Sequence, residues 1–367
     1  MHKKSKKHYK ILHITPYLEG GGAETHIRLI SKGMVERGHQ VAIYFMKGSD
    51  STKKELEKTG IKIIKGSPGV RGIAKLIAFI KQYKPDFVHA HLYKGEIYGT
   101  FVKWLYGKKL KFKLIILRHV DFWPYKPRKL WEFFQKYVFY PTADKVVGIS
   151  YAVKNFIRDE MGYNLKNVVV IHYGIPLNPP PSSPKYRIHK NRPTLGFAGR
   201  LTYQKGLDVL IRALKILDNT SHKLDVLIAG SGELYNFLNN LKDSFINVNL
   251  VLLGYVKDIH NFYESIDVFV FPTRFEGFGL VVLEAMLHNK IVIASKISSI
   301  PEVVGDAGIL ISKESPEELS KAIETFLRMS EKEKKKLMQK IKKQCKKFDI
   351  EIMLNKYEEL YNNLLKR

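Results

Sequence analysis

Two cations in the second half of the sequence stand where a predicted strand gives way to a helix. Arg200 and Lys205 follow a buried apolar run over residues 195–198, and a helical pattern begins at Gly206. Arginine offers a planar fork of donors and lysine a point charge, so this placement suits a diphosphate group. Two solvated surface cations would give the same pattern, but the position at a strand's carboxyl end favours phosphate binding.

Glu276 and Glu284 bracket a glycine-containing segment that follows another predicted strand, at residues 268–271. Glu276 is expected in the loop, and Glu284 about one turn into a helix that starts near Leu280. The backbone amides of Gly279 and Leu280 would lack intrahelical acceptors at this helix start. An acid at a helix start followed by a solvated helix glutamate gives the same spacing, so spacing alone proves little.

The first half carries a run of glycines between a predicted strand at 11–15 and an amphipathic helix at 23–37. Gly20, Gly21 and Gly22 would let the backbone approach a ligand, and a helix N-terminus favours an anion. A plain tight turn explains these glycines equally well.

Three histidines lie near predicted strand ends in the first half, namely His89, His91 and His119. The spacing of His89 and His91 could suggest a metal, but no cysteine and no clear carboxylate completes a site, so we expect none. A lone histidine is more often a satisfied polar residue than a catalyst. Because His119 stands at a strand end, contact with a ligand is as well supported for it as a purely structural role.

The elements that must position these residues repeat as strand, loop and helix. The expected strands of the first series are 11–15, 41–45, 61–64, 87–90, 114–117, 145–149 and 168–171. Those of the second series are 195–198, 224–229, 248–252, 268–271, 291–294 and 309–310. Such alternation predicts two doubly wound α/β halves with parallel sheets. Ligands of these sheets bind beyond the carboxyl ends of the strands, here in a central cleft between facing halves.

A proline-rich stretch separates the two series. Residues 176–193 hold three consecutive prolines and no apolar periodicity, which predicts an interdomain linker. The expected organisation is a first domain over 1–178, a linker over 179–193, a second domain over 194–347 and a final helix over 348–367. The final helix has enough apolar positions to dock on another part of the chain.

The charge balance of the 367 residues is strongly basic, with a net charge of +27. Residues 1–178 carry 33 lysines and arginines against 13 acids, and residues 179–367 carry 29 against 22. Such an excess favours a polyanionic partner, which is a phosphate compound, a nucleic acid or an anionic membrane, and places it on the first half. The single cysteine, Cys345, excludes an internal disulfide and a cysteine-rich zinc site and fits a reducing compartment.

Membrane contact is expected without a spanning helix. No run approaches 18 apolar residues, and the apolar stretch behind the basic start is too short for a signal peptide, so we expect a cytoplasmic protein. Aromatic and basic residues interleave in two stretches of the first half, a composition suited to an anionic membrane surface, although ordinary core packing also explains many of them. The stretches comprise Tyr93, Tyr98, Phe101, Trp104, Tyr106, Lys108, Lys109, Lys111 and Lys113, then Trp123, Tyr125, Lys126, Arg128, Lys129, Trp131, Phe133, Phe134, Lys136 and Tyr137.

Taken together, these stretches resemble the retaining, nucleotide-sugar-dependent glycosyltransferases of family 4, which have the GT-B fold. The resemblance runs from about residue 11 to residue 364, and its most specific part is the Glu-x7-Glu signature within 268–286. Residues 199–206 resemble the family's phosphate-binding segment. The fold so implied is two Rossmann-like domains facing a central cleft, with a C-terminal helix that crosses back to the first domain.

The resemblance implies a role for each candidate residue. Arg200 and Lys205 would hold the donor diphosphate as it leaves, and Glu284 would bind the ribose hydroxyls. Glu276 would bind hydroxyls of the transferred sugar, and His119 would contact that sugar near the anomeric centre. Backbone amides would be supplied by Gly21, Gly22, Gly277, Phe278, Gly279 and Leu280. No metal or other cofactor is expected, and the sequence contains no Asp-x-Asp pair to hold a cation.

The expected activity is transfer of a hexose or N-acetylhexosamine, with retention, to a lipid-linked or surface-glycan acceptor. The enzyme would work as a peripheral protein on the inner face of the membrane. A same-fold transferase with a soluble sugar or sugar-phosphate acceptor is the alternative. A nucleic-acid-binding protein would explain the charge, but no recognition motif is present and nucleic acid is not an expected partner. An inactive scaffold of the same fold would not need the charged residues Arg200, Lys205, Glu276 and Glu284. A glycoside hydrolase would need a facing pair of carboxylates, and no such pair is found outside the Glu-x7-Glu signature.

Overall fold

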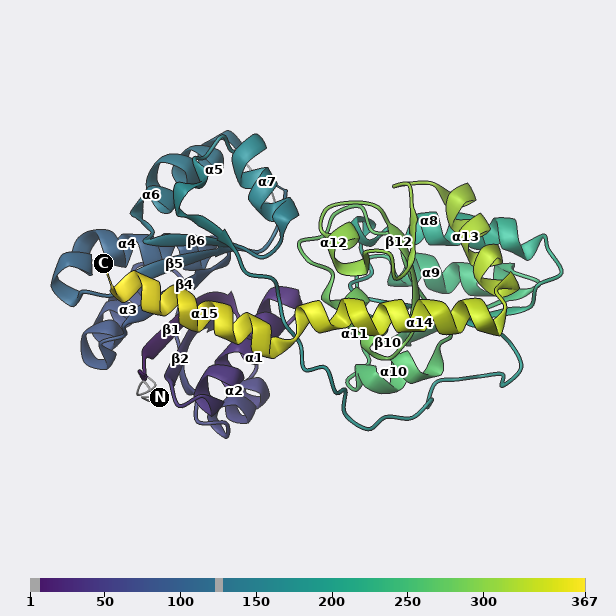
Figure 1. Ribbon diagram of the computed structural model, residues 1–367, viewed down its shortest axis with the longest axis horizontal. Coiled ribbons are helices and arrows are strands. Elements are labelled where there is room, and N and C mark those ends of the chain that lie inside the picture. The colour runs from purple at the N-terminus through teal and green to yellow at the C-terminus, as the bar shows by residue number, and fades with distance from the viewer. Residues whose placement is uncertain (1–6, 123–127, 367) are drawn as a thin grey trace. The chain divides into compact units, whose positions relative to one another are not determined.

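The structure is a computed structural model that describes residues 7–122 and 128–366, and it divides into two compact units. The first unit comprises Met1–Ile175 together with Phe348–Arg367, and the second comprises Pro176–Lys347. Figure 1 shows the elements of each unit.

The first unit is built on a parallel sheet in the order β3-β2-β1-β4-β5-β6-β7, as far as the described residues extend. Figure 1 labels its five inner strands. Its strands are β1 (Lys10–Tyr17), β2 (Gln40–Lys47), β3 (Lys62–Lys65), β4 (Phe87–His91), β5 (Lys113–Arg118), β6 (Lys145–Gly148) and β7 (Val168–Val170). The central strands β1, β4 and β5 are buried along almost their whole length. Parallel strands covered on both faces lack a polar side, so their sequences are mostly apolar, and the buried His13, His89 and His91 are exceptions.

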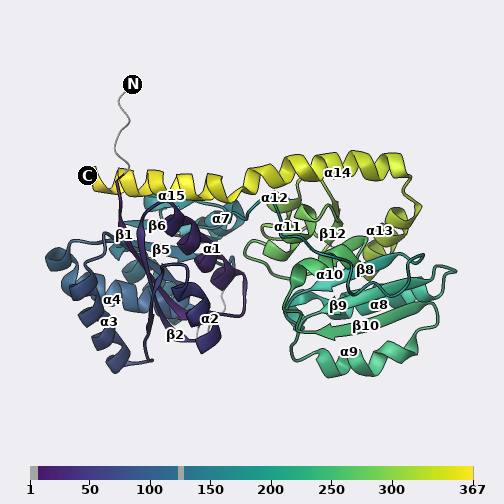
Figure 2. The same ribbon diagram turned by 90° about the horizontal axis from the view of Figure 1, so that it is seen from below.

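The connections of the first sheet are helices, with one further helix from the distant end of the chain. They are α1 (Gly22–Glu36), α2 (Asp50–Glu57), α3 (Val70–Tyr83), α4 (Leu92–Leu110), α5 (Arg128–Phe134), the π-helix η1 (Gln135–Phe139), α6 (Tyr140–Thr142), α7 (Tyr151–Asp159), η2 (Leu165–Asn167) and α15 (Ile350–Leu365). Helix α15 packs against α1, as Figure 2 shows. Its residues Leu354, Tyr357 and Tyr361 lie in the same hydrophobic core as Ile11 and Phe87 of the sheet.

The second unit repeats the plan with a parallel sheet in the order β10-β9-β8-β11-β12-β13. Its strands are β8 (Thr194–Ala198), β9 (Leu224–Ala229), β10 (Val248–Gly254), β11 (Val268–Phe271), β12 (Ile291–Ser295) and β13 (Ile309–Ile311). Its helices are η3 (Tyr203–Lys205), α8 (Leu207–Asp218), α9 (Tyr235–Leu241), η4 (Lys242–Ser244), α10 (Ile259–Ser265), α11 (Leu280–Leu287), α12 (Ile300–Val304), α13 (Pro316–Arg328) and α14 (Glu331–Cys345), and η5 (Lys346–Phe348) leads into the first unit.

Both sheets change winding direction at one pair of adjacent strands. In the first unit this pair is β1 and β4, and in the second it is β8 and β11. The loops that leave such a pair run to opposite sides of the sheet and open a crevice at its carboxyl edge. The loops after β8 and β11 are those that carry the charged residues of the predicted phosphate and sugar site.

The proline-rich segment is part of the second unit, and the chain divides after Ile175, three residues before the boundary expected at 178. Residues 179–193, expected to link two domains, form no helix or strand but are fastened to the second unit by polar contacts. Arg187 pairs with the carboxylate of Asp267 at 2.8 Å, and His189 Nδ1 lies 3.0 Å from the carboxylate of Asp225. The composition of this proline-rich segment predicts that it forms no helix or strand, but it does not predict these contacts.

None of the described helices combines the length and apolar character that crossing a bilayer requires.

Candidate active site

The loop after β8 carries the two predicted phosphate-binding cations in different environments. Arg200 is exposed, and its guanidinium lies 3.5 Å from Gln204 Oε1. Lys205 is only 8% exposed, and its ammonium lies 5.0 Å from the centre of the Phe271 ring. Arg200 is therefore free to turn toward a ligand, whereas Lys205 is held in place by the protein.

The loop after β11 places Glu276 before the start of α11. Lys205 Nζ donates to Glu276 Oε2 at 2.5 Å, so the two loops of the switch point meet through an ion pair. Counting side-chain atoms alone, Lys205 is 11% exposed and Glu276 is 17% exposed, so the ion pair is mostly buried. The structure thus brings together one predicted phosphate ligand and the predicted sugar ligand, although they are far apart in sequence.

Helix α11 begins directly after this loop with glycine at its N-cap. Gly279 has a φ of 89°, in the left-handed region that favours glycine, and no side chain of the described residues caps the helix. The first-turn amides at Leu280 therefore face the loop that holds Glu276, with the positive end of the helix dipole behind them. Gly277 and Phe278 lie in the same loop.

Glu284 lies on α11, one turn beyond the helix start, as predicted from the sequence. The hydroxyl of Tyr263, on α10, donates to Glu284 Oε2 at 2.9 Å. Burial raises the pKa of Tyr263 well above its usual value, and the neighbouring Glu284 carboxylate adds to this effect. Tyr263 therefore stays a proton donor and fixes the orientation of one carboxylate oxygen. Sequence reasoning did not identify Tyr263.

Arg274 fastens the two loops together and was also not identified from the sequence. Its guanidinium bonds to both carboxylate oxygens of Asp208 at 2.7 and 2.8 Å, to Glu314 Oε1 at 2.7 Å and to the Tyr203 carbonyl at 2.8 Å. The side chain is nearly buried, with 3% exposed. The hydrogen bonds that Arg274 donates to Asp208 lower the pKa of Asp208 and raise the pKa of Arg274. Arg274 is thus a positioning residue for the segment that bears Glu276.

A close backbone approach supports the same junction. Gly206 has a φ of 68°, and a Cβ at this position would lie 1.9 Å from the Pro272 carbonyl oxygen. The Gln204 carbonyl accepts from the Arg274 amide at 2.8 Å and from Thr273 Oγ1 at 3.1 Å. A glycine at 206 is therefore required for the loops after β8 and β11 to lie against each other.

The glycine loop of the first unit leads into α1. Helix α1 begins at Gly22 with exposed Gly21 at its N-cap, and no side chain of the described residues makes a cap hydrogen bond. The carboxylate of Glu24 turns back over this start, since a Cβ on Gly21 would lie 2.9 Å from Glu24 Oε2. An acid in the first turn already complements the helix dipole. A phosphate at Gly21 and Gly22 would have to share this end with Glu24.

His119 follows β5 in the first unit and is only 6% exposed. Its Nε2 lies 3.1 Å from Nδ1 of His91, and its Nδ1 lies 2.5 Å from the Tyr173 hydroxyl. Burial, reinforced by the Arg118 cation, lowers the pKa of His119 to about 3, so the ring is neutral near pH 7. A sugar hydroxyl could bond to a ring nitrogen only after one of these two contacts opens. The role of His119 near the anomeric centre stays a prediction.

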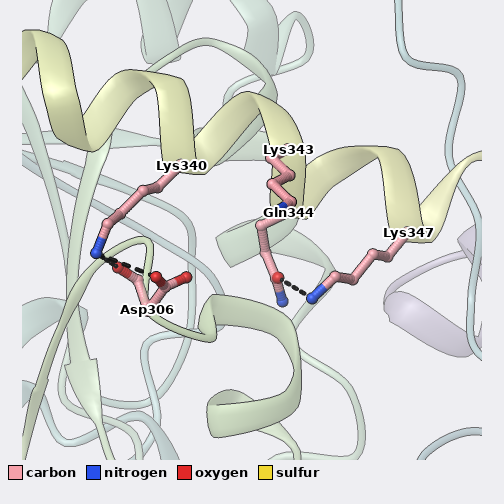
Figure 3. A pocket seen from close by; sticks show the side chains of 5 residues that line it. All are labelled: Asp306, Lys340, Lys343, Gln344 and Lys347. Atoms are coloured by element: carbon pink, nitrogen blue, oxygen red, sulfur yellow. Dashed lines mark hydrogen bonds and ion pairs between the residues drawn. The ribbon is translucent and has the colours of Figure 1, made fainter.

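A pocket of about 290 Å³ lies elsewhere in the second unit, beside α14 (Figure 3). It is lined by Asp306, Lys340, Lys343, Gln344 and Lys347. Lys340 pairs with Asp306 at 3.0 Å, and Lys347 donates to Gln344 Oε1 at 2.7 Å. It contains none of the residues at the junction of the loops after β8 and β11.

Two family models match the chain, one in each half. Residues 20–178 match Glycosyltransferase Family 4, and residues 180–347 match Glycosyl transferases group 1. The capsular polysaccharide biosynthesis glycosyltransferase CapM of Staphylococcus aureus is 24% identical over 93% of this chain and 97% of its own.

Solved structures share the fold over nearly the whole chain. A glycosyltransferase from Rickettsia africae is 23% identical, with a TM-score of 0.82 over 98% of this chain and 99% of that one. HepE of Anabaena, solved in complex with UDP and glucose, is 20% identical, with a TM-score of 0.81 over 97% of this chain and 100% of that one.

The two models meet at the division between the two series of strands, and the two parallel sheets match those of GT-B structures. The expected resemblance to family 4 glycosyltransferases and the expected fold class are confirmed. The chain is a glycosyltransferase of the family 4, group 1 type, with the GT-B fold.

Proposed function

We propose that the enzyme transfers a hexose or N-acetylhexosamine from a nucleotide-diphosphate sugar with retention of configuration. The observation that carries this proposal is the junction of the loops after β8 and β11, where Lys205 and Glu276 form a nearly buried ion pair beside the start of α11. The pair sits at the switch point of the sheet, the usual place for a nucleotide ligand. HepE, which shares the fold, was solved with UDP-glucose.

Each residue of this junction has a task that its geometry suits. Lys205 and the exposed Arg200 would neutralise the charge that grows on the leaving diphosphate, and the amides at the start of α11 would add partial positive charge. Glu276 would exchange its bond with Lys205 for sugar hydroxyls when the donor binds. Glu284, oriented by Tyr263, would accept from the ribose hydroxyls. This set supplies positive charge without a metal at the diphosphate, so we propose metal-independent transfer.

A donor panel with product analysis tests the proposal. UDP- and GDP-linked hexoses and N-acetylhexosamines would first be screened by thermal shift, where a ligand at 100 times its Kd adds about 2.7 kcal/mol of stability. The configuration of the product would then be read from its anomeric proton by NMR. Retention is expected, and inversion would refute the mechanism. The absence of binding by every nucleotide sugar would refute the donor class.

We propose a lipid-linked or surface-glycan acceptor at the cytoplasmic face of the membrane. The similarity to CapM, named for capsular polysaccharide biosynthesis, supports this acceptor class. A surface of the first unit supports the membrane. Exposed apolar side chains gather on α4 and on the adjoining α5 and η1, namely Phe101, Trp104, Leu105, Leu130, Phe133, Phe134, Tyr137 and Val138.

Lysines lie next to these apolar side chains in the sequence and suit anionic lipid. Lys108, Lys109 and Lys111 are exposed at the end of α4, and Trp104 is 76% exposed on the same helix. Lys113 lies 3.4 Å from Asp144 and is less available. Trp123, Tyr125 and Lys126 of the predicted stretch, and the side chain of Arg128, lie outside the described residues.

Vesicle sedimentation tests the membrane proposal. We expect binding to anionic vesicles, weak binding to neutral ones and release by high salt. Each basic residue near such a surface contributes about 1 kcal/mol, so reversing the charge of Lys108, Lys109 and Lys111 should weaken binding by about 3 kcal/mol or more. The matched control reverses three exposed lysines of α14, namely Lys332, Lys335 and Lys336. Wild type that stays in the supernatant at low salt would favour a soluble acceptor instead.

A further inference from the structure

Three histidines meet in the core of the first unit, on one face of its sheet. His13 on β1 and His89 on β4 are register partners, and His91 follows two residues later on the same face. All three are fully buried. Each offers a ring nitrogen, and these three nitrogens lie within 4.8 Å of one another. No metal is expected from His89 and His91 alone, because nothing nearby in the sequence completes a site; the fold supplies His13 as a further ligand.

The ring nitrogens of the trio are only partly satisfied. His13 Nδ1 lies 2.9 Å from His91 Nε2. His89 Nδ1 and His13 Nε2 have no hydrogen-bond partner among the described residues. Unpartnered buried polar atoms are rare in folded proteins and call for a physical explanation.

We propose that His13, His89 and His91 bind one first-row transition-metal ion, zinc or copper, through their imidazole nitrogens. The ligand atoms are His13 Nδ1, His91 Nε2 and His89 Nδ1. An ion between the first two replaces their direct hydrogen bond. The same ion gives the unpartnered Nδ1 of His89 a partner.

The nitrogens that would not bind the ion are already held for two of the three ligands. His89 Nε2 lies 2.9 Å from the Tyr361 hydroxyl, and His91 Nδ1 lies 3.1 Å from His119 Nε2. Metal-binding histidines usually donate their second N–H to such a partner, which fixes the tautomer and the ring orientation. His119 Nδ1 in turn contacts the Tyr173 hydroxyl, so one consistent set of tautomers serves the whole chain of rings.

The spacing of the rings also suits an ion. Two nitrogens bound tetrahedrally at about 2.0–2.1 Å stand about 3.3 Å apart, so His13 and His91 need to separate by only about 0.4 Å.

The charge of the surroundings bears on which ion binds. No carboxylate of the described residues belongs to the group, so the ligand set leaves the charge of the ion uncompensated. The free energy needed to bury an ion rises with the square of its charge, which favours a monovalent ion over a divalent one. Three imidazoles can hold monovalent copper without a fourth ligand. The ion would tie β1 to β4 and, through Tyr361, to α15. Lys205 and Glu276 of the proposed donor site lie in the second unit, whereas His119, predicted to contact the transferred sugar, touches the ligand His91 directly.

Metal analysis of the full chain tests the proposal. Protein without a polyhistidine tag would be stripped, loaded separately with zinc or with copper under reducing conditions, desalted and assayed for bound metal and melting temperature. We expect one equivalent of one ion and a higher melting temperature. X-ray absorption should show a nitrogen shell at about 2.0 Å. Less than 0.1 equivalent of either ion in wild type would overturn the proposal, whether or not any variant folds.

Two substitutions locate the ion. His89→Gln preserves an amide that can bond to Tyr361 but removes the imidazole ligand, and it should lower retained metal at least tenfold. His26→Gln is the matched control, because His26 is equally buried in the same unit, has an unpartnered Nδ1 and is outside the trio. Equal metal retention by wild type and His89→Gln would place the ion elsewhere and overturn the assignment.

Discussion

Replacing Arg274 by alanine should weaken both the second unit and its catalysis. The arginine makes a bidentate pair with Asp208 at 2.7 and 2.8 Å and is itself nearly buried. A hydrogen bond to a charged group contributes about 1.5–3 kcal/mol, and a buried partner left alone loses more. The Asp208 side chain is 34% exposed, so water replaces part of the lost interaction. We therefore expect a loss of about 2 kcal/mol in the free energy of unfolding, near the lower end of that range.

The assays are thermal unfolding and steady-state transfer. For a unit of this size, about 2 kcal/mol corresponds to a fall of about 4–8 °C in melting temperature. Because Arg274 holds the loop that bears Glu276, kcat should fall at least about tenfold, since small misplacements of reacting groups have large effects on rate. Arg274→Lys should recover little of either quantity, because an ammonium cannot form the planar bidentate pair.

Arg212→Ala is the matched control for this experiment. Arg212 contacts the same Asp208 carboxylate from one turn along α8, but at 3.4 Å and with 55% of its side chain exposed. Exposed pairs of this spacing contribute about 0.3–0.5 kcal/mol. Equal melting temperatures and equal kcat for Arg274→Ala and Arg212→Ala would refute the positioning role.

The stability difference should also depend on pH in a defined direction. Hydrogen bonds from Arg274 lower the folded-state pKa of Asp208 below its unfolded value of about 4. A lowered pKa gives stability that is present above the unfolded value and is lost as the pH falls through the folded value. The difference in the free energy of unfolding between wild type and Arg274→Ala should therefore be largest at pH 7 and become smaller below about pH 4.

Three further outcomes are expected at the same junction. Lys205→Ala and Arg200→Ala should each raise the activation barrier by about 1.5–3 kcal/mol and so lower kcat measured at saturating donor. Turnover within twofold of wild type for both variants would refute their role at the diphosphate. Glu284→Ala should mainly weaken nucleotide diphosphate binding in calorimetry, whereas Glu276→Ala should mainly lower kcat; unchanged binding by Glu284→Ala would exclude the ribose contact. Transfer should continue in EDTA, and a loss that Mg²⁺ or Mn²⁺ restores would contradict metal-independent neutralisation of the diphosphate.

The fold could be predicted because its signals are local. Strands such as β2 and β11 are buried on both faces, so each contains a short apolar run that stands out from its flanking loops. Lys205 and Glu276 could be nominated for the same reason, since each follows such a run. Their contact at 2.5 Å could not be predicted from spacing, because it depends on β8 and β11 being neighbours in the sheet.

The residues that sequence reasoning missed act through distant partners. Arg274 is one more cation in a basic chain until the fold brings Asp208 and Glu314 to it. His13 is a polar residue within a strand, and only the pairing of β1 with β4 places it beside His89. Tyr263 likewise gains its function from Glu284 on another helix. Without aligned sequences, no local pattern marks these residues.

The placement of α15 has a consequence for how the protein is made. The first unit takes its core residues Leu354, Tyr357 and Tyr361 from a helix that is synthesised after the whole of the second unit. While the ribosome is still producing β8–β13, the apolar surface around α1 and β4 is unsealed and open to aggregation or chaperone capture. The second unit is continuous in sequence and has no such delay. A substitution that weakens the packing of α15 therefore destabilises a domain whose sheet was translated long before this helix.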